Sequence, residues 1–230
     1  MSAPDVGVII VAGGSSSRTA GDELKQFRWI GGKPMLLHSL QTFQERTDVA
    51  MVVIVLPKQY AGDPPPWLFQ CDVERMLVSV GGRERSDSVR HGLEDLTDDA
   101  TLVAVHDAAR PFATAALIDR VISEARKGHG AAPGIPVVDT LKRVDEKGRV
   151  VETISRDGIL RIQTPQAFPR EMLEKAYADA HDAGISATDD ASLCERLGLP
   201  VVIVPGTERA MKITTDSDFA RAEALSILPE

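Results

Sequence analysis

Residues 8–18 read VIIVAGGSSSR, and Lys25-Gln26 follow seven residues later. An apolar run rich in β-branched residues that ends in two glycines predicts a buried parallel strand, followed by a loop of small residues. The backbone N–H groups of such a loop can approach a phosphate closely, and Arg18 and Lys25 supply cations beside it. Neither the P-loop nor the dinucleotide fingerprint is present, so the stretch indicates a nucleotide-phosphate site of another kind. A flexible loop with solvated charges is the alternative.

Length and composition indicate an ordinary globular protein. The 230 residues are 43% hydrophobic, enough for one domain or one domain with an appendage. The net charge of -8 argues against a general nucleic-acid or anionic-membrane binder, although local cations can still hold a small anion. Cys71 and Cys194 follow no disulfide or zinc pattern, which predicts free thiols in a reducing compartment. No secretory signal and no apolar run of about 18 residues is present, so we expect a cytoplasmic protein without a membrane partner.

Strand-like runs alternate with helical patterns along the chain. Strands are expected at 6–11, 51–56, 76–80, 102–105, 130–138 and 201–204. Helices are expected at 34–44, 87–96, 115–127, 170–183, 189–197 and 216–227. This order predicts an α/β fold, Rossmann-like, with a mostly parallel twisted sheet and helices on both faces. Ligands of such sheets lie beyond the carboxyl ends of the strands.

Two polar segments fall at such strand ends. Gly81-Gly82-Arg83 precedes Ser86 and Ser88, and a serine at a helix start either caps the helix or binds a ligand. The segment HDAARP covers residues 106–111.

Within HDAARP, the Asp107 carboxylate can hold a divalent metal or a substrate hydroxyl. Arg110 can bind phosphate or pair with Asp107. His106 has no triad partner nearby in the sequence, so it is weak evidence of catalysis.

Residues 136–159 interrupt the alternation of strands and helices. VVDTLKRV and RVVETIS are strand-like and are joined by residues 145–148, where Gly148 suits a positive backbone angle, so we expect a β-hairpin arm. A lone hairpin is marginal in water, and packing against another subunit in a homodimer is the economical explanation. The alternative is an arm folded back over its own active site. Residues 1–230 are then one nucleotidyltransferase domain with this insertion.

Several motifs together resemble a known family. They are AGGSSSR with Lys25-Gln26, GGRERSDSV, HDAARP, VVDTLKR with Ser155-Arg156-Asp157, QTPQAF, the run 187–192 and Met211-Lys212-Ile213-Thr214. In this order and spacing, from residue 6 to about 225, they resemble the 2-C-methyl-D-erythritol 4-phosphate cytidylyltransferases. One departure is the run of three serines after Gly14. Another is the segment 61–69, whose triproline we expect to form a surface turn without catalytic consequence.

The resemblance implies a reaction of CTP with 2-C-methyl-D-erythritol 4-phosphate that yields the CDP-linked alcohol and pyrophosphate. Catalysis is then positioning and charge neutralisation by cations and Mg²⁺. Arg18 and Lys25 match the cations on the triphosphate, and Lys212 matches the cation near the α-phosphate. We expect no metal held by the protein alone, with Mg²⁺ arriving on the CTP phosphates and touched by Asp107.

The resemblance also assigns two sets of binding residues. The nucleotide would be bound by Ala12, Gly13, Gly14, Gly82, Ser88, Asp107 and Ala108. The second substrate would be bound by Asp107, Arg110, Thr164 and Thr188, with Thr140 and Arg156 from the partner's arm. Arg156 suits a phosphate because its planar fork makes two parallel hydrogen bonds, but an ion pair with Asp157 or Asp139 is the alternative. Thr164 is as well explained as a turn residue before Pro165.

Two other functions stay open. A cytidylyltransferase for another alditol phosphate, such as ribitol 5-phosphate, would share the nucleotide half. A nucleotide-binding module without turnover is the second alternative. The presence of Arg18, Lys25, Asp107 and Lys212 argues against it, because a binding module needs no further cation at the reacting phosphate.

Overall fold

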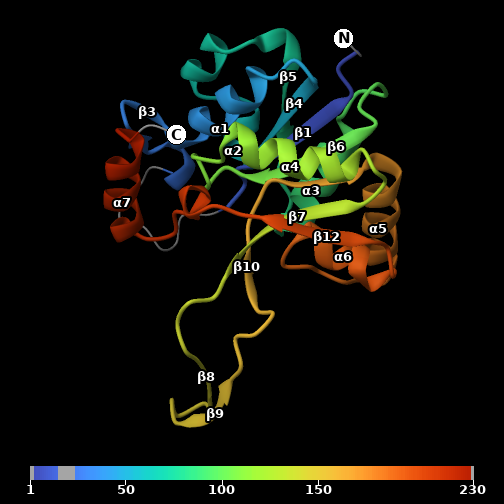
Figure 1. Ribbon diagram of the computed structural model, residues 1–230. Helices are drawn as coiled ribbons and strands as arrows, with labels where there is room; N and C mark the ends of the chain where they lie inside the picture. Colours follow the sequence, from blue (N-terminus) through green and yellow to red (C-terminus); the bar gives the residue numbers. More distant parts are fainter. Residues whose placement is uncertain (1–2, 15–23, 229–230) are drawn as a thin grey trace.

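A twisted mixed sheet forms the centre of the molecule (Figure 1). The structure is a computed structural model, which describes residues 3–14 and 24–228. Within these residues the strand order is β10-β7-β11-β6-β1-β4-β5, with β12 also paired to β7. The strands are β1 (Val6–Val11), β4 (Val49–Leu56), β5 (Met76–Val80), β6 (Leu102–Asp107), β7 (Gly130–Pro136), β10 (Leu160–Ile162), β11 (Gln166–Pro169) and β12 (Val201–Pro205).

The central strands are parallel and buried on both faces. β1 pairs in parallel with β4 and β6, and β4 pairs in parallel with β5. Strands covered on both sides need apolar residues throughout, which explains the unbroken apolar runs in the sequence. Ile9 and Ile10 point to opposite faces, and both are fully buried.

Helices cover both faces of the sheet, as predicted. The longer ones are α1 (Met35–Gln44), α3 (Arg85–Glu94), α4 (Ala115–Ala125), α5 (Arg170–Asp182), α6 (Asp190–Arg196) and α7 (Asp216–Ser226). One large core cluster joins α1 and α4 to the sheet, and a second joins α3, α5 and α6 to it. α7 packs instead on a small hairpin of β2 (Trp29–Ile30) and β3 (Lys33–Pro34). No helix among the described residues is long and apolar enough to cross a membrane.

Two strands of the sheet were not predicted. β11 lies antiparallel between β6 and β7, and β10 pairs antiparallel with the end of β7. Both strands are very short, and prolines flank or end β11, so neither has the length of alternating pattern that identifies a strand. The strand expected at 130–138 ends at Pro136.

Helix α3 begins at Arg85, two residues earlier than predicted. The side chain of Glu84 accepts from the backbone of Asp87, and the carboxylate of Asp87 accepts the Glu84 N–H at 3.1 Å. This reciprocal capping box satisfies N–H groups that would otherwise lack partners at the helix start. The cap is therefore Glu84, and neither Ser86 nor Ser88 is needed for it.

The triproline segment does more than turn the chain at the surface. It leads into a 3-10 helix, η2 (Pro66–Gln70), whose Leu68 side chain is fully buried in the core. The neighbouring Trp67 ring packs edge-on against Phe27, with 5.6 Å between the ring centroids. Because Phe27 follows Lys25 by two residues, this contact supports the segment that carries Lys25.

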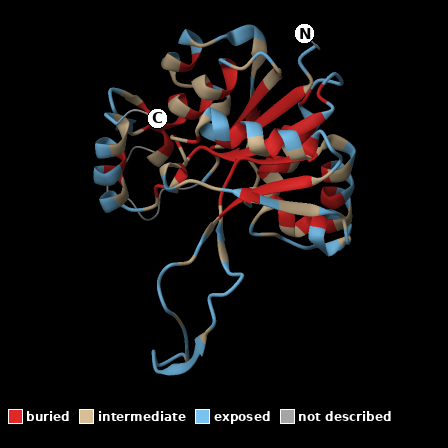
Figure 2. Ribbon diagram, in the orientation of Figure 1, coloured by how far each residue is buried: buried red, intermediate tan, exposed pale blue. Residues whose placement is uncertain are grey.

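The predicted arm is a protruding hairpin. β8 (Leu141–Val144) and β9 (Val150–Ile154) pair with each other alone, and Gly148 has a φ of 75° in the loop between them. The hairpin extends away from the sheet and its helices and is exposed along its length (Figures 1 and 2). The alternative in which it folds back over its own active site is therefore wrong.

Candidate active site

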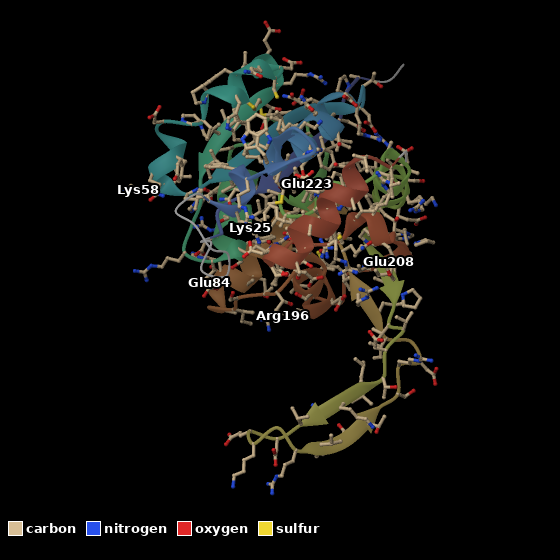
Figure 3. All side chains as sticks on the ribbon, turned by 90° about the vertical axis from the view of Figure 1, so that its left-hand side faces the viewer. Lys25, Lys58, Glu84, Arg196, Glu208 and Glu223 are labelled. Carbon is tan, nitrogen blue, oxygen red and sulfur yellow. The ribbon has the colours of Figure 1, made fainter. Side chains whose placement is uncertain are left out.

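The ends of β1, β5 and β6 open into a cavity of about 640 Å³, here called the glycine-loop cavity. Its described lining includes Lys25 and Glu84, both labelled in Figure 3. Nine residues predicted for nucleotide binding or catalysis line it: Ala12, Gly13, Gly14, Lys25, Gly82, Ser88, Asp107, Ala108 and Lys212. Arg18 lies outside the residues that the structure describes.

Glycines allow the two loops of this cavity to meet. A Cβ on Gly13 would lie 3.3 Å from Ser88 Oγ, and one on Gly81 would lie 3.2 Å from the Leu56 carbonyl oxygen. A Cβ on Gly82 would approach the Asp87 Cβ to 2.1 Å. A larger residue at Gly82 would therefore clash with the start of α3, whereas the close approach of the two loops themselves is at Gly13 and Gly81.

Ser88 holds one of these loops in place. Its hydroxyl donates to the Glu84 carbonyl at 3.1 Å and accepts the Gly82 N–H at 3.1 Å. The side chain is 3% exposed. Ser88 therefore does not cap α3, and in this structure it fixes Gly82 against the start of that helix. Its contact with the nucleotide stays a prediction.

Asp107 lies at the centre of the site, where β6 ends. Its Oδ1 accepts from Arg85 Nε at 3.0 Å and its Oδ2 from Lys212 Nζ at 2.7 Å. Burial alone would raise the pKa of this carboxyl, but the nearby charges of Arg85, Lys212 and Arg110 hold that pKa well below its usual range. Asp107 is therefore a carboxylate at any pH near neutrality.

A second cavity of about 450 Å³, here called the threonine cavity, adjoins the first. Asp107, Arg110, Thr164 and Thr188, all predicted to bind the second substrate, line it. The two cavities share three charged residues, which are Arg85, Asp107 and Lys212. A larger cavity of about 720 Å³ lies between β10 and α7, and it shares Arg110 and Lys212 with the threonine cavity.

Arg110 is tied mainly to backbone groups. Its guanidinium donates to the Ala210 carbonyl at 2.7 Å and the Ile162 carbonyl at 3.3 Å, and its Nε lies 4.0 Å from Asp107 Oδ2. The expected pairing with Asp107 is therefore a distant one. Burial lowers the pKa of Arg110, and Asp107 opposes that effect.

Thr164 forms a hydrogen bond with the backbone of Asp107. Its Oγ1 accepts the Asp107 N–H at 3.0 Å and lies 3.2 Å from His106 Nδ1. His106 Nε2 lies 3.1 Å from the Arg110 carbonyl, which can only accept, so the neutral ring carries its proton on Nε2. Nδ1 then accepts the Thr164 hydroxyl proton. Burial lowers the pKa of His106 to about 4, which keeps this chain of hydrogen bonds neutral.

Thr140 and Arg156 lie on the arm and line neither cavity of their own chain. Both residues are exposed. The Arg156 guanidinium donates to the Val138 carbonyl. Within the described residues it pairs with neither Asp139 nor Asp157, so the ion-pair alternative is wrong for the single chain.

The sequence reasoning assigned no role to Arg85, although it quoted the segment containing it. Arg85 bridges Asp107 to Asp190, and Asp190 also accepts from the Tyr177 hydroxyl at 2.6 Å. The available clue was Arg85 within GGRERSDSV, near the start of an expected helix. A cation in the first turn of a helix is unfavourable with the helix dipole, so it needs an acidic partner.

A mostly parallel sheet whose first strand ends in a glycine loop beside lysines is the arrangement expected of a nucleotidyltransferase, and the comparisons place the chain in that class. The 2-C-methyl-D-erythritol 4-phosphate cytidylyltransferase family matches residues 6–227. The chain belongs to this family and is a cytidylyltransferase, as the motifs indicated.

Individual relatives agree. A protein of Frankia casuarinae named for the same activity is 42% identical over 226 residues, covering 98% of this chain and 82% of its own. One from Syntrophus aciditrophicus is 39% identical, covering 96% of this chain and 95% of its own. The crystal structure of the cytidylyltransferase from Thermus thermophilus superposes with a TM-score of 0.83 at 35% identity, covering 97% of this chain and 100% of that one. These similarities favour neither the alternative alditol phosphate nor the inactive module.

Proposed function

We propose that this cytidylyltransferase joins CTP to 2-C-methyl-D-erythritol 4-phosphate at the point where the two cavities meet, forming 4-diphosphocytidyl-2-C-methyl-D-erythritol and pyrophosphate. One observation carries the proposal: Asp107 and Lys212 line both cavities and are 2.7 Å apart. A phosphorus atom at the boundary of the two cavities could therefore be reached by groups in either cavity.

CTP occupies the glycine-loop cavity in this proposal. The backbone of Ala12, Gly13 and Gly14 cradles the phosphates, and the loop at Gly82, held by Ser88, contacts the cytidine with Asp107 and Ala108. Lys25, together with Arg18, neutralises the triphosphate. Pyrophosphate leaves as its charge is stabilised by these cations.

Lys212 exchanges partners during the reaction. It moves from the Asp107 carboxylate to the α-phosphate, where negative charge is shared in the transition state. Asp107 keeps Arg85 as its counter-ion, so the carboxylate is not left unpaired. Its freed Oδ2 then faces the substrates.

Mg²⁺ fits this arrangement as a companion of CTP. Hard carboxylate oxygens suit Mg²⁺, and Asp107 at the end of β6 would be the residue to contact an ion carried by the CTP phosphates. No group of three metal-ligating side chains occurs in the described part of the chain. The ion would supply charge neutralisation of the triphosphate when bound.

The alcohol phosphate occupies the threonine cavity. Arg110 and Thr188 orient it, Thr164 acts through Asp107, and an oxygen of its phosphate attacks the α-phosphorus in line with the departing pyrophosphate.

The partner's arm completes this site in the proposal. Thr140 and Arg156 reach the threonine cavity of a second subunit in a homodimer. Val138, Val144, Val150 and Val151 support this, because each is at least half exposed on the arm and would be buried by a partner. The chain as a whole is one nucleotidyltransferase domain with the insertion 136–159. A cytoplasmic location suits its two free cysteines, Cys71 and Cys194.

The test is pyrophosphate release with CTP, Mg²⁺ and each candidate alcohol phosphate. Turnover with 2-C-methyl-D-erythritol 4-phosphate and little with ribitol 5-phosphate is expected. Equal turnover with both would contradict the assigned substrate, and no turnover with either would contradict the activity. A Lys212→Ala variant run alongside controls for a contaminating enzyme.

A further inference from the structure

Arg85 is bound to two carboxylates of the site. All three of its nitrogens are used: Nε donates to Asp107 Oδ1 at 3.0 Å, Nη1 to Asp190 Oδ1 at 2.9 Å and Nη2 to Asp190 Oδ2 at 2.8 Å. The side chain is 22% exposed, and that of Asp190 is 0% exposed. One planar guanidinium thus joins the end of β6 to the first residue of α6.

The position of α6 depends on this link. Asp190 also accepts from the Tyr177 hydroxyl, and its backbone N–H donates to Gln166 Oε1 at 3.1 Å. The other end of the Gln166 amide donates to Asp189 Oδ2 at 2.9 Å. Thr188, which lines the threonine cavity, comes directly before these anchored residues. Its position therefore follows from where Asp190 is held.

Arg85 also lines both cavities. We propose that Arg85 is a positioning residue that fixes Asp107 and, through Asp190, the Thr188 segment, so that the alcohol phosphate is bound in line with the nucleotide. This inference rests on the function proposed above, because it treats the two cavities as the subsites of the two substrates. Arg85 needs no contact with either substrate for this role.

The geometry explains why arginine is required. The guanidinium grips Asp190 with two parallel hydrogen bonds and still has Nε for Asp107. The single ammonium of a lysine cannot span both carboxylates in this way. Removing only the cation would leave Asp190 charged and buried, which destabilises the fold strongly.

The decisive variant is therefore the charge-balanced pair Arg85→Gln with Asp190→Asn. It removes the link without leaving a buried charge, and Asp107 keeps Lys212. The matched control is Arg196→Gln with Asp179→Asn, which removes an ion pair of 3.0 Å on the surface between α6 and α5 (Arg196 is labelled in Figure 3). Melting temperature, the dissociation constant for CTP alone, and kcat and KM for the alcohol phosphate are measured for each.

We expect the KM for the alcohol phosphate to rise about ten-fold more than the CTP dissociation constant, which corresponds to the loss of one charge-assisted hydrogen bond. The control variant should have the same two constants as the wild type. For Arg85→Lys, the KM for the alcohol phosphate should lie between those of the wild type and the double variant. An unchanged KM, or equal losses for both substrates with a lowered melting temperature, overturns the proposal.

If the double variant does not fold, Arg85→Lys gives the same comparison, and equal changes in both constants overturn the proposal there too. The wild-type assay separates the two hypotheses. Absence of wild-type turnover refutes the function, whereas normal turnover in wild type and double variant alike refutes only the positioning role.

Discussion

The ammonium of Lys212 donates a hydrogen bond to the Asp107 carboxylate across 2.7 Å, and the two residues lie 105 positions apart in the chain. Arg85 pairs with the other oxygen of the same carboxylate. The Lys212 ammonium can therefore move from Asp107 to a phosphate while the Asp107 carboxylate keeps Arg85 as its ion-pair partner. The Lys212 side chain is 44% exposed, which leaves room for this movement.

Replacing Lys25 or Lys212 by alanine should lower kcat by about 10²–10³-fold, since each charge is expected to stabilise the transition state. The melting temperature should change little, because neither side chain belongs to the core clusters. Lys58→Ala, at an exposed residue labelled in Figure 3, is the matched control for loss of a lysine. Normal turnover with an altered melting temperature would show that the two lysines are structural.

Chelation should abolish activity, and added Mg²⁺ should restore it. The metal is expected to arrive with CTP, so protein dialysed without nucleotide should carry none by elemental analysis. A metal retained through dialysis, or turnover in excess EDTA, would be inconsistent with this role.

Stability should fall as the solution becomes acidic, partly because of His106. Burial lowers its pKa from 6.5 to about 4 in the folded state, so below pH 6.5 the unfolded chain binds a proton that the folded chain excludes. The free energy of unfolding should then decrease by about 3 kcal/mol as the pH falls from 6.5 towards about 4. His38, whose pKa burial also lowers, contributes in the same direction.

Denaturant unfolding across this pH range checks the effect. His106→Gln should remove most of the loss, since glutamine keeps a donor for the Arg110 carbonyl and does not titrate. His181→Gln, at an exposed histidine, should behave as wild type. An unaltered acid loss in His106→Gln would assign the effect to other groups.

The arm predicts complementation between inactive chains. Arg156→Ala and Lys25→Ala, each nearly inactive alone, should regain activity after subunit exchange, because a mixed dimer has one site with both defects and one with neither. About a quarter of wild-type activity is expected in a randomised mixture, since about half of the dimers are mixed.

The exchange itself must be verified, for example by mass-tagged subunits. An Arg143→Ala chain, altered on the hairpin but outside the predicted site, should be active alone. If exchange occurs and activity stays absent, Arg156 acts within its own subunit.

Much of the fold was predictable because the information is local. The run at 8–11, the two glycines after it and the hairpin loop with Gly148 each express a backbone preference that needs no distant partner. The first and third predicted strands, 6–11 and 76–80, have the predicted ends. The motif order, likewise linear, was enough to identify the family, and most of the predicted site residues line two adjoining cavities.

What the tertiary structure decided is which groups satisfy one another. Arg85 and Asp190 are 105 residues apart, and no sequence period relates them. The insertion of β11 between β6 and β7, the attachment of Arg110 to backbone carbonyls, and the support of Asp107 by Thr164 also join distant segments. A buried polar group must find a partner wherever packing brings one, so these pairings exist only once the chain has folded.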